Sequence, residues 1–331
     1  MKKFILLFAI ILLIAAFGVF SFLPNYLSKS SNAEEVIIAV PNGASLSRVA
    51  NELYEKGVIR SKLWFRYSGK DIARNIKPGN YKIGPGLDIE EIYKIIQKGE
   101  HENQIKVTFP EGFILYQFAQ RIEEAGLGTA EEFIKASKDY FTLKGYDLDT
   151  SNMYFSMEGY LFPDTYYFTE KQDIDEIVSK LASAMDGVLT EEYRAKAEEL
   201  GMSIHEVLTI ASLIEREAYN DAERKTVSGV IHNRLKNHML LQIDASVIYG
   251  LGEGKDHMTR LLYADLEKDN PYNTYKNIGL PPGPIASPGR KSIEAALYPE
   301  DHDYLYYVLG ENGHVFSKTY DEHLVNVGKY R

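Results

Sequence analysis

The 331-residue chain contains no cysteine and a single tryptophan. The lack of cysteine excludes a disulfide framework, a thiolate nucleophile and a zinc site with cysteine ligands. Positive charge is also scarce, because 37 Lys and Arg stand against 47 Asp and Glu, a formal net charge of −10. We therefore expect no nucleic-acid partner. By contrast, 24 tyrosines and 15 phenylalanines supply flat faces that can stack on sugar rings, although tyrosines fill protein cores equally well.

One long hydrophobic run lies at the N-terminus. After two lysines the chain is uncharged from Phe4 to Leu23, about the ~20 residues that a helix needs to cross a bilayer. A cleaved signal peptide is the alternative, but its apolar region is normally ~7 to 15 residues long. We expect a retained, single-pass transmembrane helix over residues 4–23 in the cell membrane. The lysines favour a cytoplasmic location for residues 1–3 and an extracellular or periplasmic one for the rest.

The polar composition of residues 24–35 predicts a tether. An internal repeat follows this segment. The segment AVPNGASLSRVANELYEKGVI resembles TFPEGFILYQFAQRIEEAGLG, 69 residues further on. Each copy predicts a strand, a Pro-x-Gly turn and an amphipathic helix that stops at Gly57 or Gly126. The corresponding apolar positions are Leu46, Val49, Ala50 and Leu53 in the first copy and Leu115, Phe118, Ala119 and Ile122 in the second.

The segment between the copies predicts a short strand hairpin and then a helix over residues 89–97. A small strand-and-helix module of this kind can be a binding module, and a structural spacer is an equally good interpretation. Further on, SMEGYLFPDTYYF predicts a buried strand and turn in which Glu158 and Asp164 need partners. Helices are expected at roughly 174–189, 191–200, 204–218, 222–237 and 293–297. The last predicted element is a hairpin, YLYYVLGENGHVFS. This mixture predicts an α+β fold.

Several catalytic motifs are absent. His205-Glu206 would begin a zinc-binding H-E-x-x-H helix, but the second histidine would have to be residue 209, which is a threonine. There is no G-x-S-x-G motif for a serine nucleophile. The Gly-rich segment 279–289 lacks the lysine and the helix start of a phosphate-binding loop. We therefore expect no metal and no organic cofactor.

Two acids near the end of a predicted apolar helix are the candidates for chemistry. At ~100° per residue, Glu215 and Glu217 lie on opposite flanks of the apolar face, each roughly 80° from its centre. A carboxyl group against an apolar wall has a raised pKa and can donate a proton near neutral pH. Periodicity does not choose between the two acids, and a solvated helix end is the simpler interpretation of either.

Polar residues and tyrosines follow in an apolar frame. MLLQIDASVIYGLG contributes Gln242, Asp244 and Tyr249, and PYNTYKNIGLPPGPIASPG contributes Asn273 and Tyr275. Together they form a candidate groove for a sugar chain. Each is also explained structurally, since Asp244 can cap a helix and the prolines can shape a surface loop.

The motifs ASLIERE, VSGVIHNRL, LQIDASVIYG, PYNTY, GLPPGPIASPG and EGYLFPDTYY occur behind one predicted span. In this combination the chain resembles the MltG-type, or YceG-like, endolytic murein transglycosylases. The match runs from Glu158 to about His314. The resemblance implies a LysM-like module at residues 36–103 and a catalytic domain at residues 104–331, although the local match in the first region is weak.

The resemblance also implies a function. Such an enzyme cuts nascent peptidoglycan within its glycan strands and leaves 1,6-anhydro-N-acetylmuramic ends. The catalytic acid would be Glu217, and Glu215 would support it. The substrate-binding residues would be Gln242, Asp244, Tyr249, Asn273 and Tyr275. Peptidoglycan strands are the expected partner, with wall synthases of the elongation machinery as candidate protein partners.

Two other functions fit the same residues. A hydrolytic muramidase shares the substrate but needs a second carboxylate about 5 to 9.5 Å from the first, for which Asp244 and Glu223 are candidates. A membrane-tethered glycan-binding scaffold would need no catalytic acid at all. Product analysis separates these alternatives, because anhydro ends indicate a transglycosylase and reducing ends indicate a hydrolase.

Overall fold

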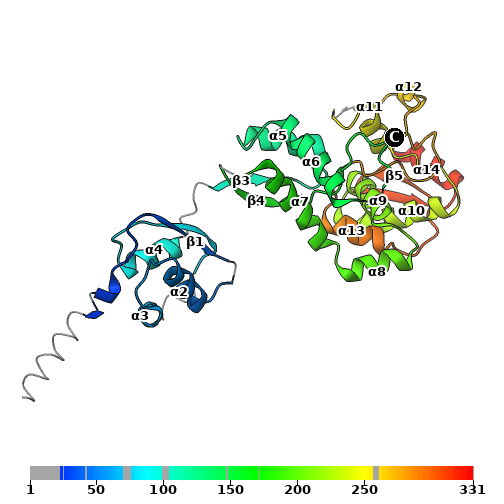
Figure 1. Ribbon diagram of the computed structural model, residues 1–331. Coiled ribbons are helices and arrows are strands. Elements are labelled where there is room, and N and C mark those ends of the chain that lie inside the picture. The colour runs from blue at the N-terminus through cyan, green and yellow to red at the C-terminus, as the bar shows by residue number, and fades with distance from the viewer. Residues whose placement is uncertain are drawn as a thin grey trace, which may run out of the picture. The chain divides into compact units, whose positions relative to one another are not determined.

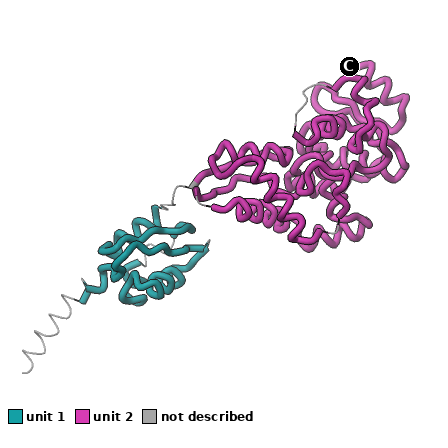
Figure 2. The backbone as a smooth tube through the Cα atoms, turned by 45° about the horizontal axis from the view of Figure 1, so that its top comes forward, with its two compact units in different colours: residues 1–104 teal, residues 105–331 magenta. Residues whose placement is uncertain are grey.

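The computed structural model describes residues 23–24, 26–41, 43–69, 76–98, 104–146, 148–170, 172–255 and 261–330. The chain divides into two compact units, Met1–Gln104 and Ile105–Arg331 (Figure 2). The predicted cytoplasmic residues and, apart from Leu23, the predicted membrane span lie outside the described residues. None of the helices in the described ranges has both the length and the apolar character that crossing a membrane requires.

In the residues that the structure describes, the first unit has an antiparallel pair of strands with helices packed beside it. Its elements are β1 (Val36–Val40), α2 (Leu46–Glu55), α3 (Lys62–Ser68), β2 (Gly79–Ile83) and α4 (Ile89–Lys98). Ile38 of β1 lies opposite Tyr81 of β2, and both side chains are fully buried. The apolar faces of α2 and α4 pack on the same core, so this small unit has a hydrophobic core of its own.

The second unit begins with the same order of elements and continues with a larger helical part. Its elements are β3 (Gln104–Thr108), α5 (Leu115–Glu124), α6 (Ala130–Lys144), β4 (Thr165–Thr169), α7 (Ile174–Val188), α8 (Glu191–Glu199), α9 (Ile204–Glu217), the 3₁₀ turn η1 (Asp221–Glu223), α10 (Arg224–Lys236), α11 (Asp244–Leu251), α12 (Tyr263–Leu266), α13 (Arg290–Leu297), β5 (Tyr306–Gly310), β6 (Gly313–Ser317) and α14 (Tyr320–Tyr330) (Figure 1). Strand β3 pairs with β4, and β5 pairs with β6.

The internal repeat corresponds to two strand–helix–helix–strand modules, β1-α2-α3-β2 and β3-α5-α6-β4. The expected strand, turn and helix of each copy are confirmed. Gly57 and Gly126, both with positive φ, follow the helix ends, where a residue without Cβ adopts the left-handed conformation at no steric cost. The predicted hairpin between the copies is wrong, because β2 pairs with the distant β1 and not with a neighbouring strand.

Helix α9 lies in the middle of the second unit, where it packs against α13, α10, α11 and α8. Every residue from Val207 to Ile214 is buried. At its start, the Ser203 hydroxyl accepts from the Glu206 N–H, and the Glu206 carboxylate accepts from the Ser203 N–H. This capping box fixes where the helix begins, and the buried stretch that follows fixes its orientation in the core.

Several helices differ from the expectation, and α3, α6, α12 and α14 were not predicted. The chain does not close with the β5–β6 hairpin, since α14 follows it and packs against both strands. Its sequence carries little signal because none of its residues is buried. Helix α13 begins at Arg290, three residues before the predicted start, because Gly289 ends the preceding loop in an extended conformation.

The two acids in SMEGYLFPDTYYF have different environments. Asp164 is exposed, whereas Glu158 is fully buried and accepts hydrogen bonds from the backbone N–H of Leu115 and from the hydroxyl of Tyr249. Burial raises the pKa of Glu158 to about 8. Glu158 thus finds the expected partners at the start of α5, where the free N–H groups of the first helical turn donate to a carboxyl oxygen.

Candidate active site

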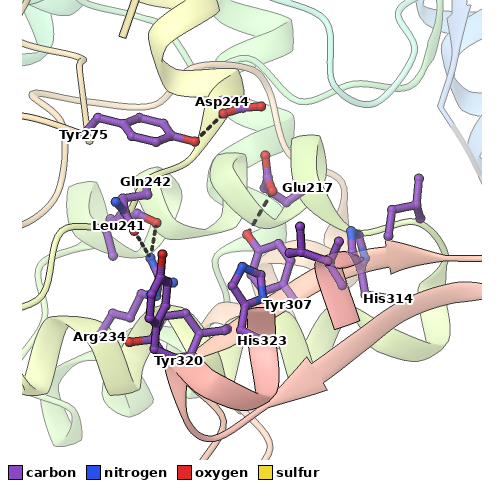
Figure 3. A pocket seen from close by; sticks show the side chains of 14 residues that line it. Glu217, Arg234, Leu241, Gln242, Asp244, Tyr275, Tyr307, His314, Tyr320 and His323 are labelled. Atoms are coloured by element: carbon purple, nitrogen blue, oxygen red, sulfur yellow. Dashed lines mark hydrogen bonds between the residues drawn. The ribbon is translucent and has the colours of Figure 1, made fainter. Parts of the chain in front are cut away.

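Glu217 is the last residue of α9, and the chain turns away at Ala218 into an extended conformation. Its side chain therefore leaves the buried face of the helix and enters a cavity of about 340 Å³. Helices α9, α10, α11 and α14, the β5–β6 hairpin and two loops contribute to the walls (Figure 3). The lining residues are Glu217, Arg234, Leu241, Gln242, Asp244, Tyr275, Tyr306, Tyr307, Val308, Leu309, His314, Tyr320, His323 and Val327.

The carboxyl group of Glu217 is held at the meeting point of two elements. The Tyr307 hydroxyl of β5 donates a 2.9 Å hydrogen bond to Glu217 Oε2 (Figure 3), and the backbone N–H of Ala245 in the first turn of α11 stabilises the carboxylate. Burial is the largest influence and raises the pKa of Glu217 to about 7; the charge of Asp244 adds to the increase, and Tyr307, Ala245 and Arg216 oppose it. Such a group is partly protonated near neutral pH and can act as a general acid.

Asp244 lies in the same cavity. It is the first residue of α11, so the expectation that it caps a helix beginning at Ala245 is wrong by one position. Its carboxylate accepts a 2.6 Å hydrogen bond from the Tyr275 hydroxyl, which fixes both side chains on one wall (Figure 3). The cavity therefore contains two carboxyl groups, each bonded to a different tyrosine.

Gln242 completes this wall through an uncommon backbone conformation. Its φ is 51°, in the left-handed region that non-glycine residues seldom adopt. The conformation is held by a hydrogen bond from the Gln242 N–H to the carbonyl of Thr274 and by the Arg234 guanidinium, which donates to the side-chain oxygen of Gln242. Strain of this kind concentrates at functional sites.

Glu215 has a different environment from Glu217. Its side chain is 7 % exposed and forms an ion pair with Arg224 at 3.2 Å. It also accepts hydrogen bonds from the backbone N–H of Gly289 and the hydroxyl of Ser292. Glu215 therefore joins α9 to α10 and to the start of α13, and it is not among the residues that line the cavity.

Tyr249 and Asn273 also lie outside the cavity lining. The Tyr249 hydroxyl donates to the buried Glu158, and the Asn273 side chain donates to the carbonyls of Leu266 and Lys268. Both side chains are buried and shape the surrounding loops. The structure thus brings Glu217, Gln242, Asp244 and Tyr275 together in one cavity. It places Glu215, Tyr249 and Asn273 outside the lining of that cavity.

The sequence patterns missed a second group of residues in the cavity. Tyr306, Tyr307 and His314 come from the β5–β6 hairpin, and Tyr320 and His323 come from α14. Arg234 of α10 binds the carbonyls of Leu240, Leu241 and Leu305, which ties the hairpin end to the loop before α11. The clustering of aromatic residues in the predicted hairpin was the signal that could have found the first three.

Over most of its length the chain is similar to known proteins. A profile described as the YceG-like family matches residues 38–329. An endolytic murein transglycosylase of Bacillus subtilis (strain 168) is 37 % identical over 307 residues, which cover 89 % of this chain and 84 % of that protein. An endolytic murein transglycosylase of Streptococcus pneumoniae serotype 2 (strain D39 / NCTC 7466) is 29 % identical; the match covers 99 % of this chain and 65 % of the streptococcal one.

A solved structure has the same fold over most of the chain. The crystal structure of a yceG-like protein from Listeria monocytogenes superposes with a TM-score of 0.61 at 36 % sequence identity. The alignment covers 89 % of this chain and 99 % of the Listeria chain.

Proposed function

Because the chain belongs to the YceG-like family, we propose that it is a lytic murein transglycosylase that cuts peptidoglycan within its glycan strands. The observation that carries the proposal is the Glu217 carboxyl group, which has a pKa of about 7 in a tyrosine-lined cavity of about 340 Å³. The names of the relatives from Bacillus subtilis and Streptococcus pneumoniae support the same reaction. Sugar rings are the ligands that such an aromatic and hydrogen-bonding cavity suits.

In the proposed reaction Glu217 acts first as an acid and then as a base. The protonated carboxyl donates to the glycosidic oxygen between N-acetylmuramic acid and N-acetylglucosamine, and the bond from C1 to that oxygen breaks through an oxocarbenium-like state. The 6-hydroxyl of the muramoyl unit closes onto C1, and the Glu217 carboxylate takes the proton of that hydroxyl. The acid is thereby regenerated, and a 1,6-anhydro end is left. Because the nucleophile belongs to the substrate, a water-activating carboxylate is not needed.

Mass spectrometry of the products tests the reaction directly. Purified sacculi digested with the protein should release fragments with 1,6-anhydro ends. The lengths of these fragments should show that the strands were cut at internal positions. Reducing ends would support a hydrolytic muramidase. In that case Asp244 is the better candidate for the second carboxylate, because it lies in the same cavity as Glu217. The carboxylate of the other candidate, Glu223, is bound to His314 and the Tyr219 N–H. Binding of sacculi without any cleavage would support the glycan-binding scaffold.

The pH dependence of cleavage should follow the titration of Glu217. Because the acid form is lost as the pH rises through its pKa of about 7, we expect kcat/KM to fall above that pH. In Tyr307→Phe the hydrogen bond that lowers the pKa of Glu217 is absent, so the alkaline limb should move to higher pH. Profiles of kcat/KM against pH on glycan fragments measure the alkaline limb of the wild type and that of Tyr307→Phe. Tyr306→Phe, which removes the neighbouring cavity hydroxyl, is the matched control and should leave the limb in place.

We also propose that residues 4–23 anchor the protein in the cell membrane, with residues 1–3 in the cytoplasm and residues 36–103 and 104–331 outside as a LysM-like module and the catalytic domain. The length of the uncharged run supports the anchor, and the external location of peptidoglycan supports the orientation. Wall synthases remain the proposed protein partners. The full chain should stay in membranes washed with high salt and be accessible to external protease. Release by salt would contradict the anchor.

A further inference from the structure

A buried acid stands behind one histidine of the cavity. His314 Nδ1 lies 2.8 Å from Glu223 Oε1, and the two side chains are 11 % and 10 % exposed. The same carboxylate accepts from the backbone N–H of His314 at 3.0 Å and from that of Tyr219 at 2.5 Å. His314 lines the cavity and Glu223 does not. The ring nitrogen Nδ1 is therefore held by a carboxylate that is not part of the cavity lining.

The contacts of Glu223 fix which ring nitrogen of His314 is bonded to the protein. Burial alone would raise the pKa of Glu223, but hydrogen bonds from His314 and Tyr219 lower it below its ordinary value, so the carboxylate is ionised and can only accept. Nδ1 of the imidazole must then carry a proton, and Nε2 is the ring nitrogen that is left for a ligand. Within the described part of the chain, Nε2 has no hydrogen-bond partner.

The hairpin holds this ring beside the catalytic acid. His314 pairs with Leu309 in the antiparallel register, which puts His314 and Tyr307 on one face of the hairpin, and the two rings meet edge to face at 5.0 Å. Tyr307 is the residue that donates to Glu217. At Gly313, whose φ is 129°, an added Cβ would lie 3.1 Å from Glu223 Oε2. The absence of a side chain there permits the close approach of hairpin and acid.

We propose that His314 contacts the substrate, and that Glu223 is its positioning residue. The ring, held at Nδ1 by Glu223, presents Nε2 to a hydroxyl or amide group of the sugar unit that is seated beside Glu217. This assignment rests on the proposed function, since it names a further contact in the same glycan site. It differs from a role in stability because His314 lines the cavity and its Nε2 bonds to no described part of the protein.

A binding experiment on a non-cleaving background tests the contact. In full-length Glu217→Gln, calorimetry measures the Kd for purified, uncrosslinked glycan fragments. Adding His314→Asn keeps an amide donor near the position of Nδ1 and deletes the hydrogen-bonding atom Nε2. The Kd should rise about tenfold, the upper part of the range for one neutral hydrogen bond. The matched control is His238→Asn, at an exposed position with a φ of 52° that asparagine tolerates well; it should leave the Kd unchanged.

A double-mutant cycle tests the positioning role of Glu223. On the same background, Glu223→Gln alone should weaken binding, and it should weaken it no further once His314→Asn is present. A purely structural role would instead give additive losses and a lower melting temperature in His314→Asn. Additive losses, or an unchanged Kd in His314→Asn, would overturn the proposal. The reaction itself is judged separately, because wild-type protein that releases no anhydro ends contradicts the proposed function whatever the cycle gives.

Discussion

Glu217→Gln should abolish the formation of anhydro ends, with a fall in the cleavage rate of at least about 10²-fold, the contribution of a general acid. The substitution keeps the volume of the side chain and removes the proton that is donated to the glycosidic oxygen. The Gln amide can still accept from Tyr307, so the cavity should keep its shape. The measurement is the rate of anhydro-product release from sacculi, together with glycan affinity and the melting temperature.

The comparison with Glu215→Gln makes this prediction specific. Glu217→Gln should retain glycan binding and thermal stability while cleavage is lost. If Glu215→Gln lost cleavage at unchanged stability and Glu217→Gln did not, the acid would have been assigned to the wrong residue. Loss of binding together with cleavage in Glu217→Gln would contradict the role of a proton donor, since a donor is needed only for bond breaking.

Glu215→Ala should lower the free energy of unfolding of the second unit by about 3 to 5 kcal/mol, the cost of removing one partner from a buried ion pair. Arg224, which is 12 % exposed in the intact protein, would keep Asp221 and Ser292 as hydrogen-bond partners within the described residues. The backbone N–H of Gly289 would also lose its acceptor. Chemical denaturation followed by circular dichroism measures the change.

The position of the single tryptophan helps to assign each unfolding transition to one of the two units. Trp64 lies in the first unit, so its fluorescence follows that unit and should be unaffected by Glu215→Ala. The matched control is Glu294→Ala, which removes an exposed ion pair with Lys225 between the same helices, α10 and α13. An exposed pair contributes about 0 to 1 kcal/mol. Equal losses in the two variants would mean that the Glu215 pair does not join α9, α10 and α13.

Much of the fold is readable from local patterns. The two strand–turn–helix copies, the stop at Gly57 and Gly126, and the apolar helix around Val207 all follow from periodicity and from the conformations that glycine permits. The partner of β2 was not readable, because strand pairing depends on contacts distant in the sequence. Helix α14 was missed because it buries no residue, so its sequence contains no core positions to mark it.

The candidate site divides in the same way. The sequence motifs indicated Glu217, Gln242, Asp244 and Tyr275, all of which line one cavity. They also indicated Tyr249 and Asn273, whose polar groups satisfy buried partners instead. A polar residue between apolar neighbours has the same sequence pattern whether it lines a cavity or bonds to a buried group. The partner that decides between these roles lies in a distant part of the sequence.

By itself the sequence determined the family, the order of most elements and the presence of two acids at the end of an apolar helix. Helical geometry set Glu215 and Glu217 on opposite flanks and left them equivalent. The family resemblance selected Glu217, but only the tertiary structure gave a physical difference between the two acids. It placed Arg224 and the start of α13 against Glu215, where an ion pair fixes the position of the side chain, and it placed Tyr307, Asp244 and a cavity against Glu217. Burial raises the pKa of Glu217, and the walls that bury it include a strand about 90 residues further along the chain, so no local pattern contains this environment.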